Sequence, residues 1–341
     1  MTFSGSPITV FSTCPQSKDR GAYEYLQAVR DVARWSEDAG CRGILVYTDN
    51  GIVDPWLVSQ VILESTQELA PLIAVQPVYM HPYTVAKMVT SLAFMHGRRV
   101  SLNMLAGGFK NDLIALGDQT PHDERYERTV EYTQIVIGLL RGEAPVTTHG
   151  RYYDVTNLKL TPRLPAELLP EMLISGSSPA GRAAAQAIGA TPISYPNPPG
   201  EQEGPGIGKD FGVRVGIVAR DSADEAWRVA RERFPEDREG QITHKLATAA
   251  SDSHWHEQLS GRDGGGELDA RGEPHPYWLG PFKSYKTFCP YLVGSHSRVA
   301  AELAGYMRLG STHFILDIPP SREELEHMGI VFAEARAVAA G

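Results

Sequence analysis

Short apolar runs alternate with longer amphipathic segments along most of this chain. A short continuous apolar run fits a strand that is buried on both faces, whereas apolar residues at about every third or fourth position indicate a helix. Helix-like segments follow most of the apolar runs, and this order is typical of parallel βα units rather than of hairpins. We expect eight strands, at residues 8–11, 43–47, 72–76, 99–103, 172–175, 192–195, 212–219 and 313–317.

The expected helices complete this pattern. The clearest one lies over residues 120–141, where Tyr126 and Val130 begin an apolar face at helical spacing. We expect Thr120 to cap that helix and Pro121 to occupy its first turn. Strands and helices in this order, within 341 residues, predict an α/β fold of the (β/α)8 TIM-barrel type. The other helices are expected over residues 23–39, 56–69, 83–95, 179–188, 224–234, 297–309 and 322–340.

Two segments interrupt the alternation. Residues 198–210 are polar and rich in Pro and Gly, which predicts a mobile loop. Residues 251–290 are rich in His, Gly and aromatic residues without clear periodicity. An insertion of that size in a barrel is expected on the active-site face, where it would form a lid. We expect a single domain over residues 1–341 that includes both of these segments.

Charge and cysteine content narrow the classes of function. The chain has 32 Lys and Arg residues against 41 Asp and Glu residues, a net charge of −9, and an acidic surface repels nucleic acid. No apolar run is long enough to cross a membrane, and we expect no secretion signal at the N-terminus. The three cysteines, Cys14, Cys41 and Cys289, are scattered along the chain, so we expect a reduced, cytoplasmic protein.

The strongest candidate for chemistry is the segment Ile174–Pro179, in which a strand, a glycine, two hydroxyls and a helix start follow one another. Ser178 is the natural N-cap of that helix, and capping alone would explain it. The alternative is an anion site, because free N–H groups, the helix dipole and two hydroxyls suit a phosphate. The residues by themselves leave both interpretations open.

Two further patterns have a similar double interpretation. At Asn103–Gly108, paired glycines let a flat ligand approach the backbone and the Asn103 amide can donate and accept, although Gly-Gly also occurs in plain loops. His122, Arg125 and Tyr126 share one helix face. They fit either contacts to a ligand or a solvated helix start with a buried tyrosine.

Taken in order, these motifs resemble those of the luciferase-like flavin monooxygenases. LNMLAGG, PHDERYE and LISGSSPAG are similar to motifs of the alkanesulfonate monooxygenase branch, as are DPWLV from Asp54 and PYTVAK from Pro82. The resemblance covers most of residues 20–200 and 290–335, and it implies a TIM barrel with insertions. The cofactor it implies is FMN, commonly supplied in reduced form by a separate reductase, with O₂ as the second substrate.

The resemblance also assigns individual residues to the cofactor. It implies that Gly176, Ser177 and Ser178 hold the FMN phosphate, joined by Tyr126 and His122 from the neighbouring helix. A second group of residues would border the isoalloxazine ring, and one aromatic residue would stand near the pocket. These are Gln76, Asn103, Ala106 and Gly107 for the ring, and Tyr195 for the aromatic position.

The substrate half departs from the sulfonate enzymes at most polar positions. Ile52 stands where they have Cys, Gly216 where they have His, Tyr285 near their mobile-loop Arg and Pro319 at their late Tyr, while Arg214 is retained. A site that clamps a small sulfonate needs fixed cations and donors. We therefore expect a larger or more apolar substrate, covered by aromatic residues of the 251–290 insertion.

His81, Tyr79 and Arg214 are the candidates for catalysis. His81 fits a general acid or base near the flavin, since imidazole titrates near neutral pH, but it also fits a cap on the following helix. Tyr79 fits a hydrogen-bond donor to a reacting oxygen or a packing residue. Cys14 follows the first strand, so we expect it on the catalytic face. A lone cysteine without a neighbouring base is, however, also typical of an unreactive packing residue.

The sequence therefore predicts an FMN-dependent, two-component monooxygenase that acts on an organic small molecule. A deazaflavin-dependent oxidoreductase and a non-catalytic flavin-binding protein of the same fold are the alternatives. The expected partners are the substrate, O₂ and a flavin reductase, and we expect a homodimer or a higher homo-oligomer. We expect no metal site, because His254 and His256 lack further ligands at metal-binding spacing.

Overall fold

The computed structural model describes residues 3, 8–18, 20–201, 210–249, 251, 253–262, 264 and 274–340. The chain divides into two compact units. The first unit comprises Met1–Thr13, Arg34–Arg42 and Ile193–Gly341, and the second comprises Cys14–Ala33 and Gly43–Pro192. The single domain expected over residues 1–341 stays a prediction.

Parallel strands in chain order form the sheet of the second unit. They are β2 (Gly43–Val46), β3 (Ala70–Val75), β4 (Ser101–Leu105) and β7 (Met172–Ser175), and each is hydrogen-bonded to the next. The register places Leu45 beside Leu72, and Ala74 beside Asn103. Both faces of a barrel strand are buried, one under helices and the other in the barrel interior, which is why the sequence shows continuous apolar runs rather than alternation.

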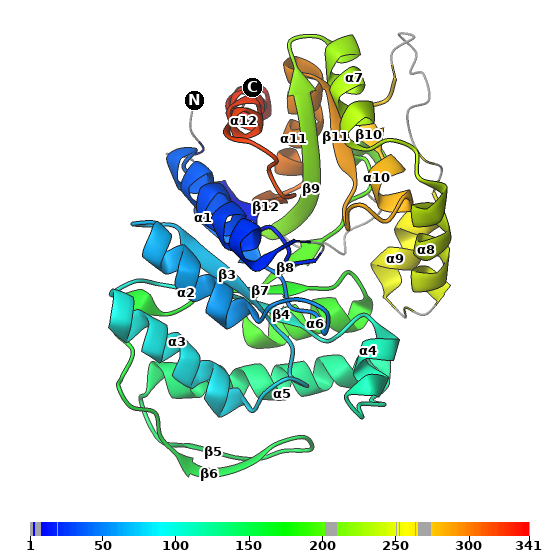
Figure 1. The fold of residues 1–341 in the computed structure, drawn as a ribbon. Coiled ribbons are helices and arrows are strands. Elements are labelled where there is room, and N and C mark those ends of the chain that lie inside the picture. Colours follow the sequence, from blue (N-terminus) through cyan, green and yellow to red (C-terminus); the bar gives the residue numbers. More distant parts are fainter. Residues whose placement is uncertain are drawn as a thin grey trace. The chain divides into compact units, whose positions relative to one another are not determined.

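Helices α3 (Pro82–His96) and α5 (His122–Arg141) pack together in this unit, and Tyr132 of α5 is fully buried with its hydroxyl donating to the Met80 carbonyl at 3.1 Å. Figure 1 shows a hairpin of β5 (Val146–His149) and β6 (Asp154–Leu158) on the side of α5 away from the strands. Its largely exposed strands contain no apolar run, so the sequence pattern does not reveal them. The other elements are α1 (Ala22–Asp38), which both units share, α2 (Pro55–Ser65), α4 (Lys110–Ala115), a 3₁₀ turn (Ala166–Leu168) and α6 (Pro179–Ile188).

The first unit is built around the long strand β9 (Phe211–Arg220). Its first half pairs in parallel with β12 (Ser311–Leu316) and with the end of β8 (Thr191–Ser194), and β12 pairs in turn with β1 (Thr9–Thr13). Its second half pairs in parallel with β11 (Tyr291–Ser295), to which β10 (Tyr277–Trp278) is antiparallel.

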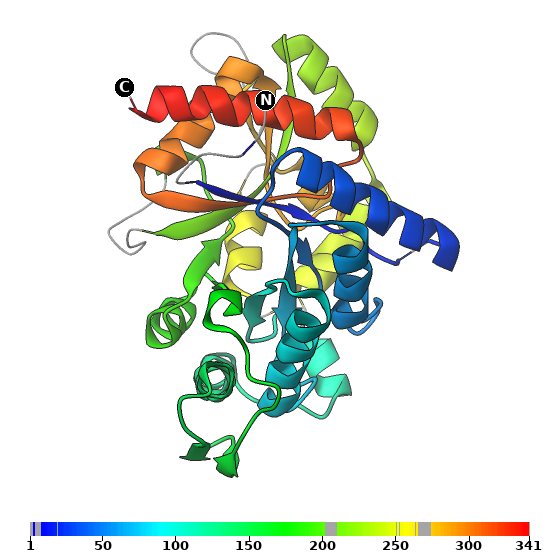
Figure 2. The same cartoon turned by 90° about the vertical axis from the view of Figure 1, so that its left-hand side faces the viewer.

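Helices α11 (His296–Arg308) and α12 (Arg322–Ala340) pack side by side next to these strands (Figures 1 and 2). Phe332 of α12 meets Phe314 of β12 edge to face, with 5.2 Å between ring centroids. No helix among the described residues is long and apolar enough to cross a membrane. The other elements are a 3₁₀ turn (Pro199–Glu201), α7 (Ala223–Arg233), α8 (Arg238–Ala249), α9 (His254–Ser260) and α10 (Gly280–Lys283).

The eight expected strands are all present as β1, β2, β3, β4, β7, β8, β9 and β12. The α5 helix begins at His122, with Pro121 at its N-cap, and Thr120 instead donates its hydroxyl to the Asp118 carboxylate at 2.6 Å. Of the expected loop 198–210, residues 202–209 lie outside the described residues. Residues 252, 263 and 265–273 of the expected lid 251–290 do so too.

Candidate active site

The turn from β7 to α6 gathers hydrogen-bond donors at one point. Ser178 is the N-cap of α6, where its Oγ accepts the Gly181 N–H at 3.1 Å, and Pro179 fills a first-turn position that needs no N–H. The other N–H groups of the first turn and the positive end of the helix dipole face the same point. A helix start of this kind binds a phosphate or another anion.

Gly176 allows Tyr126 to approach this turn closely. A Cβ atom at position 176 would lie 2.2 Å from the Tyr126 hydroxyl, so a larger residue would displace the phenol. Tyr126 is a buried residue of α5, and the His122 ring packs edge-on against it with 5.3 Å between centroids. The structure therefore brings together the residues that the sequence assigns to a phosphate, namely Gly176, Ser177, Ser178, Tyr126 and His122.

The Ser177 hydroxyl is buried and makes no hydrogen bond within the described part of the chain. An unsatisfied buried polar group costs about 1–3 kcal/mol, and in native proteins it often marks the place of a ligand, an ion or a water. Ser177 stands directly between Gly176 and the N-cap of α6. Its hydroxyl and the helix amides together suit a phosphate group.

Of the residues expected to border the isoalloxazine ring, Asn103 lies within β4 and the others directly follow β3 or β4. Asn103 is buried in β4 and its Oδ1 accepts the Ser175 hydroxyl at 3.1 Å, so the amide is held in one orientation. Gly107 has a φ of 96°, which favours glycine, and a Cβ there would lie 3.4 Å from Nε2 of Gln76. Ala106, which directly precedes Gly107, is buried. All of these residues belong to the second unit.

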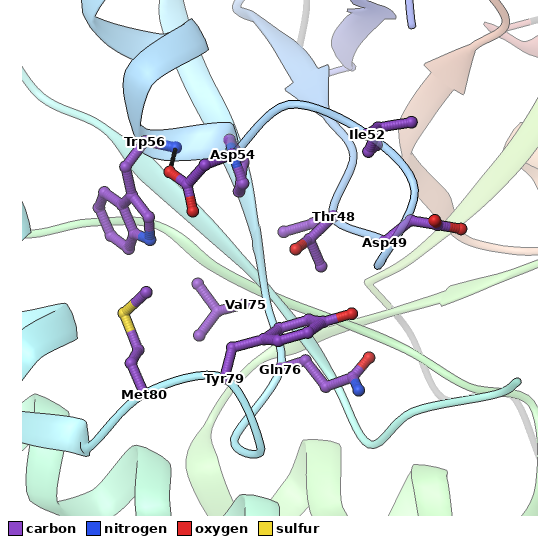
Figure 3. Close-up of a pocket in the computed structure, with 11 residues that line it drawn as sticks. Thr48, Asp49, Ile52, Asp54, Trp56, Val75, Gln76, Tyr79 and Met80 are labelled. Carbon is purple, nitrogen blue, oxygen red and sulfur yellow. Dashed lines mark hydrogen bonds between the residues drawn. The ribbon is translucent and has the colours of Figure 1, made fainter. Parts of the chain in front are cut away.

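A pocket of about 240 Å³ opens at the carboxyl ends of β2 and β3 (Figure 3). In a barrel, the active site forms at this end of the strands. In Figure 3 the Tyr79 ring lies next to the Gln76 amide, and its hydroxyl points to the side on which Asp49 lies. The pocket is lined by Ile52, Gln76 and Tyr79 of the expected site, and by Thr48, Asp49, Asp54, Pro55, Trp56, Ala74, Val75 and Met80.

Tyr79 is held by a short chain of hydrogen bonds. Its hydroxyl donates to Oδ1 of Asn50 at 2.8 Å, and Nδ2 of Asn50 donates to the Asp112 carbonyl at 3.2 Å. Burial, followed by the negative charges of Asp49 and Asp112, raises the pKa of Tyr79 to about 12. The phenol therefore keeps its proton at neutral pH, and it can act as a donor but not as a base.

Of two other candidates, His81 caps a helix and Cys14 is buried. Nδ1 of His81 accepts the Tyr83 N–H at 3.2 Å, so His81 is the N-cap of α3, as the second interpretation of the sequence has it. Cys14 is buried, and burial raises the pKa of its thiol, which keeps it protonated. A catalytic role of His81 and a substrate role of Cys14 stay predictions.

Arg214 and Tyr195 belong to the first unit and form part of a buried polar cluster there. Nη1 of Arg214 donates to the Tyr195 hydroxyl at 3.2 Å, and Nη2 lies 3.8 Å from Oδ1 of Asp317. Oδ2 of Asp317 accepts the Tyr291 hydroxyl at 2.8 Å. Tyr195 and Asp317 follow β8 and β12 directly, so this cluster also lies at carboxyl ends of strands.

Tyr291 and Asp317 are not among the residues that the sequence indicates. Tyr291 begins β11, a strand that the sequence pattern does not reveal, and its ring fills the space in front of Gly216. A Cβ atom at position 216 would lie 2.3 Å from that ring. The one available signal was the position of Asp317, a charged residue at the end of an apolar strand.

The described part of the expected lid packs on Tyr195. Trp255 of α9 stacks on the Tyr195 ring at 3.8 Å between centroids with 15° between planes, and His256 lies beside Trp255 at 3.6 Å. Tyr285 has a φ of 55° and its ring lies 5.7 Å from that of Phe288. A lid function of these residues stays a prediction.

Comparison with known proteins agrees with this arrangement. A sequence profile described as luciferase-like monooxygenase matches residues 7–313. The chain belongs to the luciferase-like monooxygenase family. A curated relative, the 4-(gamma-L-glutamylamino)butanoyl-[BtrI acyl-carrier protein] monooxygenase BtrO of Niallia circulans, is 32% identical over 320 residues, which cover 91% of this chain and 92% of the relative.

Solved structures show that this luciferase-like monooxygenase has the fold predicted from its sequence. The oxygenating constituent of 3,6-diketocamphane monooxygenase of Pseudomonas putida, in complex with FMN, matches with a TM-score of 0.67 at 16% identity, over 96% of this chain and 98% of that one. An F420-dependent secondary alcohol dehydrogenase matches with a TM-score of 0.66 at 15% identity, over 96% of this chain and 99% of that one. The predicted TIM-barrel class and the assignment as a monooxygenase are confirmed. Its substrates are therefore a small molecule and O₂.

Proposed function

We propose that this monooxygenase binds FMN, receives it in reduced form from a separate flavin reductase, and acts on an organic molecule other than a simple alkanesulfonate. The observation that carries the proposal is the buried, unpaired Ser177 hydroxyl beside the Ser178-capped start of α6. A phosphate ester would supply the acceptor that this hydroxyl lacks.

Residues of the second unit would hold the cofactor at both ends. Ser177, Tyr126 and the first-turn amides of α6 would bind the phosphate, while Asn103 and Gly107 would border the ring. When bound, reduced FMN supplies the chemistry that activates O₂ and oxygenates the substrate. The protein binds and orients the partners, keeps water out, and holds a proton on the Tyr79 hydroxyl.

The substrate is best described as an acyl compound that contains an amide. BtrO is named for a 4-(gamma-L-glutamylamino)butanoyl group carried by an acyl-carrier protein, and it shares 32% identity with this chain. That degree of identity over 91% of the chain supports a related substrate class here. The missing sulfonate-site groups at Ile52, Gly216 and Pro319 agree with such a substrate.

The proposal includes the cytoplasmic location and the homodimer or higher homo-oligomer expected from the sequence. A deazaflavin-dependent oxidoreductase is the second candidate, because the F420-dependent alcohol dehydrogenase shares the fold.

Titration with FMN, riboflavin and F420 tests the proposal and separates the two candidates. FMN should bind more tightly than riboflavin, which lacks the phosphate, by at least about tenfold, and F420 should bind weakly or not at all. With a flavin reductase and isotopically labelled O₂, labelled oxygen should appear in the product. Equal affinity for FMN and riboflavin would contradict the phosphate site, and tight binding of F420 alone would favour the second candidate.

A further inference from the structure

The pocket shown in Figure 3 lies wholly within the second unit, and it shares a residue with the expected cofactor site. Gln76 lines the pocket, and its Nε2 atom would lie 3.4 Å from a Cβ atom at Gly107, one of the residues expected at the flavin ring. A molecule that fills this pocket of about 240 Å³ would therefore lie next to the ring of the proposed cofactor. We assign the pocket to the substrate, an assignment that rests on the proposed function.

The lining of the pocket combines apolar side chains with two carboxylates. Asp49 and Asp54 are the charged residues among those that line it. Each carboxylate accepts a backbone N–H group through Oδ1, from Gly51 at 2.6 Å and from Trp56 at 2.9 Å. Among the residues that the structure describes, the Oδ2 atoms have no hydrogen-bond partner and no cation pairs with either carboxylate. The apolar side chains are those of Ile52, Pro55, Trp56, Ala74, Val75 and Met80.

The indole of Trp56 offers a hydrogen-bond donor to the same space. Trp56 has 3% of its surface exposed, and no described residue accepts a hydrogen bond from its indole N–H. Figure 3 shows the nitrogen edge of the indole turned toward the side on which Asp54 and Val75 lie. A buried donor without a partner often marks the place of a ligand or a water. The pocket therefore lacks an acceptor as well as a cation.

The carboxylates give this part of the second unit a negative potential. Burial, and then the charges of Asp49 and Asp112, raise the pKa of Tyr79, which lines the pocket. Burial, and then the charge of Asp49, also raises the pKa of Asp112. A cation in the pocket would relieve this repulsion, whereas a further anion would increase it.

We propose that the pocket binds a part of the substrate in which an ammonium group and a hydrogen-bond acceptor, such as an amide carbonyl, are joined by a short alkyl chain. Asp49 and Asp54 would face the ammonium group, and the Trp56 N–H would donate to the acceptor. The chain between the two groups would pack on the apolar side chains of the pocket. Asp49, Asp54 and Trp56 are specificity residues in this account.

The physical reason is charge matching at a partly exposed site. A carboxylate attracts an ammonium group, but solvent weakens the attraction, so one such pair changes affinity by only about two- to fivefold. Two carboxylates without a cation should together give a clear preference for an ammonium group. They should also disfavour a carboxylate at the same place, because like charges repel.

Three probes with the same amide and the same chain test the proposal by calorimetry, with and without FMN. N-acetylputrescine ends in an ammonium group, N-pentylacetamide in a methyl group and N-acetyl-δ-aminovalerate in a carboxylate. The wild-type protein should bind N-acetylputrescine at least about fivefold more tightly than N-pentylacetamide, and the carboxylate probe should bind most weakly. The preference should shrink in high salt, because salt screens exposed charges.

Substitutions assign the preference to the pocket. Asp49→Asn and Asp54→Asn keep the shape, and asparagine caps a helix as well as aspartate does. Each should reduce the ammonium preference about two- to threefold, and the double variant should abolish it. Glu64→Gln, at an exposed position near the other end of α2, is the matched control and should keep the wild-type preference. Trp56→Phe, which lacks the indole N–H, should weaken both amide probes about threefold and leave their ratio unchanged.

Thermal unfolding of each sample reports whether the variant folds, and if Trp56→Phe does not fold, the aspartate variants decide alone. Equal affinity of the wild-type protein for N-acetylputrescine and N-pentylacetamide would overturn the proposal. An unchanged preference in a folded double variant, or a failure of all three probes to bind, would do the same.

Loss of N-acetylputrescine binding on saturation with FMN would show that the cofactor itself occupies the pocket, and this result would also overturn the proposal. The proposed function fails on a different result, a lack of FMN binding by the wild-type protein. In that case the titrations without FMN still measure the ammonium preference.

Discussion

At two glycines in this molecule a tyrosine side chain packs directly against the backbone, but the two places differ in the hydrogen bonds that their buried polar groups make. At Gly176, in the second unit, a Cβ atom would lie 2.2 Å from the Tyr126 hydroxyl, and the next residue, Ser177, is left with a buried hydroxyl that no described residue satisfies. At Gly216, in the first unit, a Cβ would lie 2.3 Å from the Tyr291 ring, and the Tyr291 hydroxyl is satisfied by Asp317.

The two regions therefore differ in whether their buried polar groups have hydrogen-bond partners. A buried group without a partner is a cost that a ligand can remove, and the proposed FMN phosphate would remove it at Ser177. At Gly216 the Tyr291 hydroxyl and the Asp317 carboxylate already satisfy one another, so no ligand is needed to complete that arrangement. Substitutions at the two glycines should therefore have different consequences.

Gly176→Ala should have the largest effect on cofactor binding. The added methyl group would displace the Tyr126 hydroxyl from the turn, and the loss of a hydrogen bond to a charged phosphate together with misplacement of Ser177 should weaken FMN binding roughly a hundredfold. Fluorescence titration of FMN measures this. Gly189→Ala, at the left-handed C-cap of the same helix, is the matched control: it should cost about 1 kcal/mol of stability and leave FMN affinity unchanged.

Gly216→Ala should act on stability instead of on cofactor affinity. Its methyl group would overlap a ring that is buried on all sides, and overpacking of this kind costs about 1–3 kcal/mol. Urea unfolding measures the loss, and the double variant Gly216→Ala with Tyr291→Leu should recover part of it. A loss of FMN affinity with no loss of stability would show that the two regions are not separate in function.

We expect a smaller effect of pH on the free energy of unfolding, through helix α9, whose Trp255 stacks on Tyr195. Burial, and then the charge of His244, lowers the pKa of His256 from 6.5 to about 4. Between those values the unfolded chain binds a proton that the folded chain does not, so the free energy of unfolding falls as the pH falls. The contribution of His256 should be about 1–2 kcal/mol between about pH 7 and pH 5.

Urea unfolding at several pH values in that range tests this expectation. The slope should be smaller in His256→Gln, while His254→Gln, at an exposed position of the same helix, should keep the wild-type slope. Equal slopes in the wild-type protein and in His256→Gln would contradict the burial of a neutral imidazole.

The strands and helices that could be predicted are those whose pattern is local. Residues 172–175 and 179–188 were predictable to the residue, because an apolar run leads into Ser178, Pro179 and a helix that stops at Gly189. The strand β11 and the β5–β6 hairpin could not be predicted. The strand β11 is a short apolar run beside an aromatic-rich insertion, and the hairpin is mostly exposed, so it has no apolar run.

The same distinction holds for the candidate site. Residues 176–178, at the start of α6, are consecutive in the sequence. Their spacing and the rules of helix capping are therefore enough to indicate a candidate anion site. The Arg214–Asp317–Tyr291 cluster joins residues that are far apart in the sequence, and only the fold brings them together. His81 shows the limit of local reasoning, because both of its interpretations fit the sequence and the structure shows the helix cap.

The central claim is that the Ser177 hydroxyl is reserved for the phosphate of FMN. The direct measurement is the FMN affinity of Ser177→Ala beside that of Ser222→Ala, which removes the N-cap serine of α7 in the other unit. Ser177→Ala should bind FMN about tenfold or more weakly than the wild-type protein, with riboflavin affinity unchanged, and Ser222→Ala should bind FMN normally. Wild-type FMN affinity in Ser177→Ala would contradict the account.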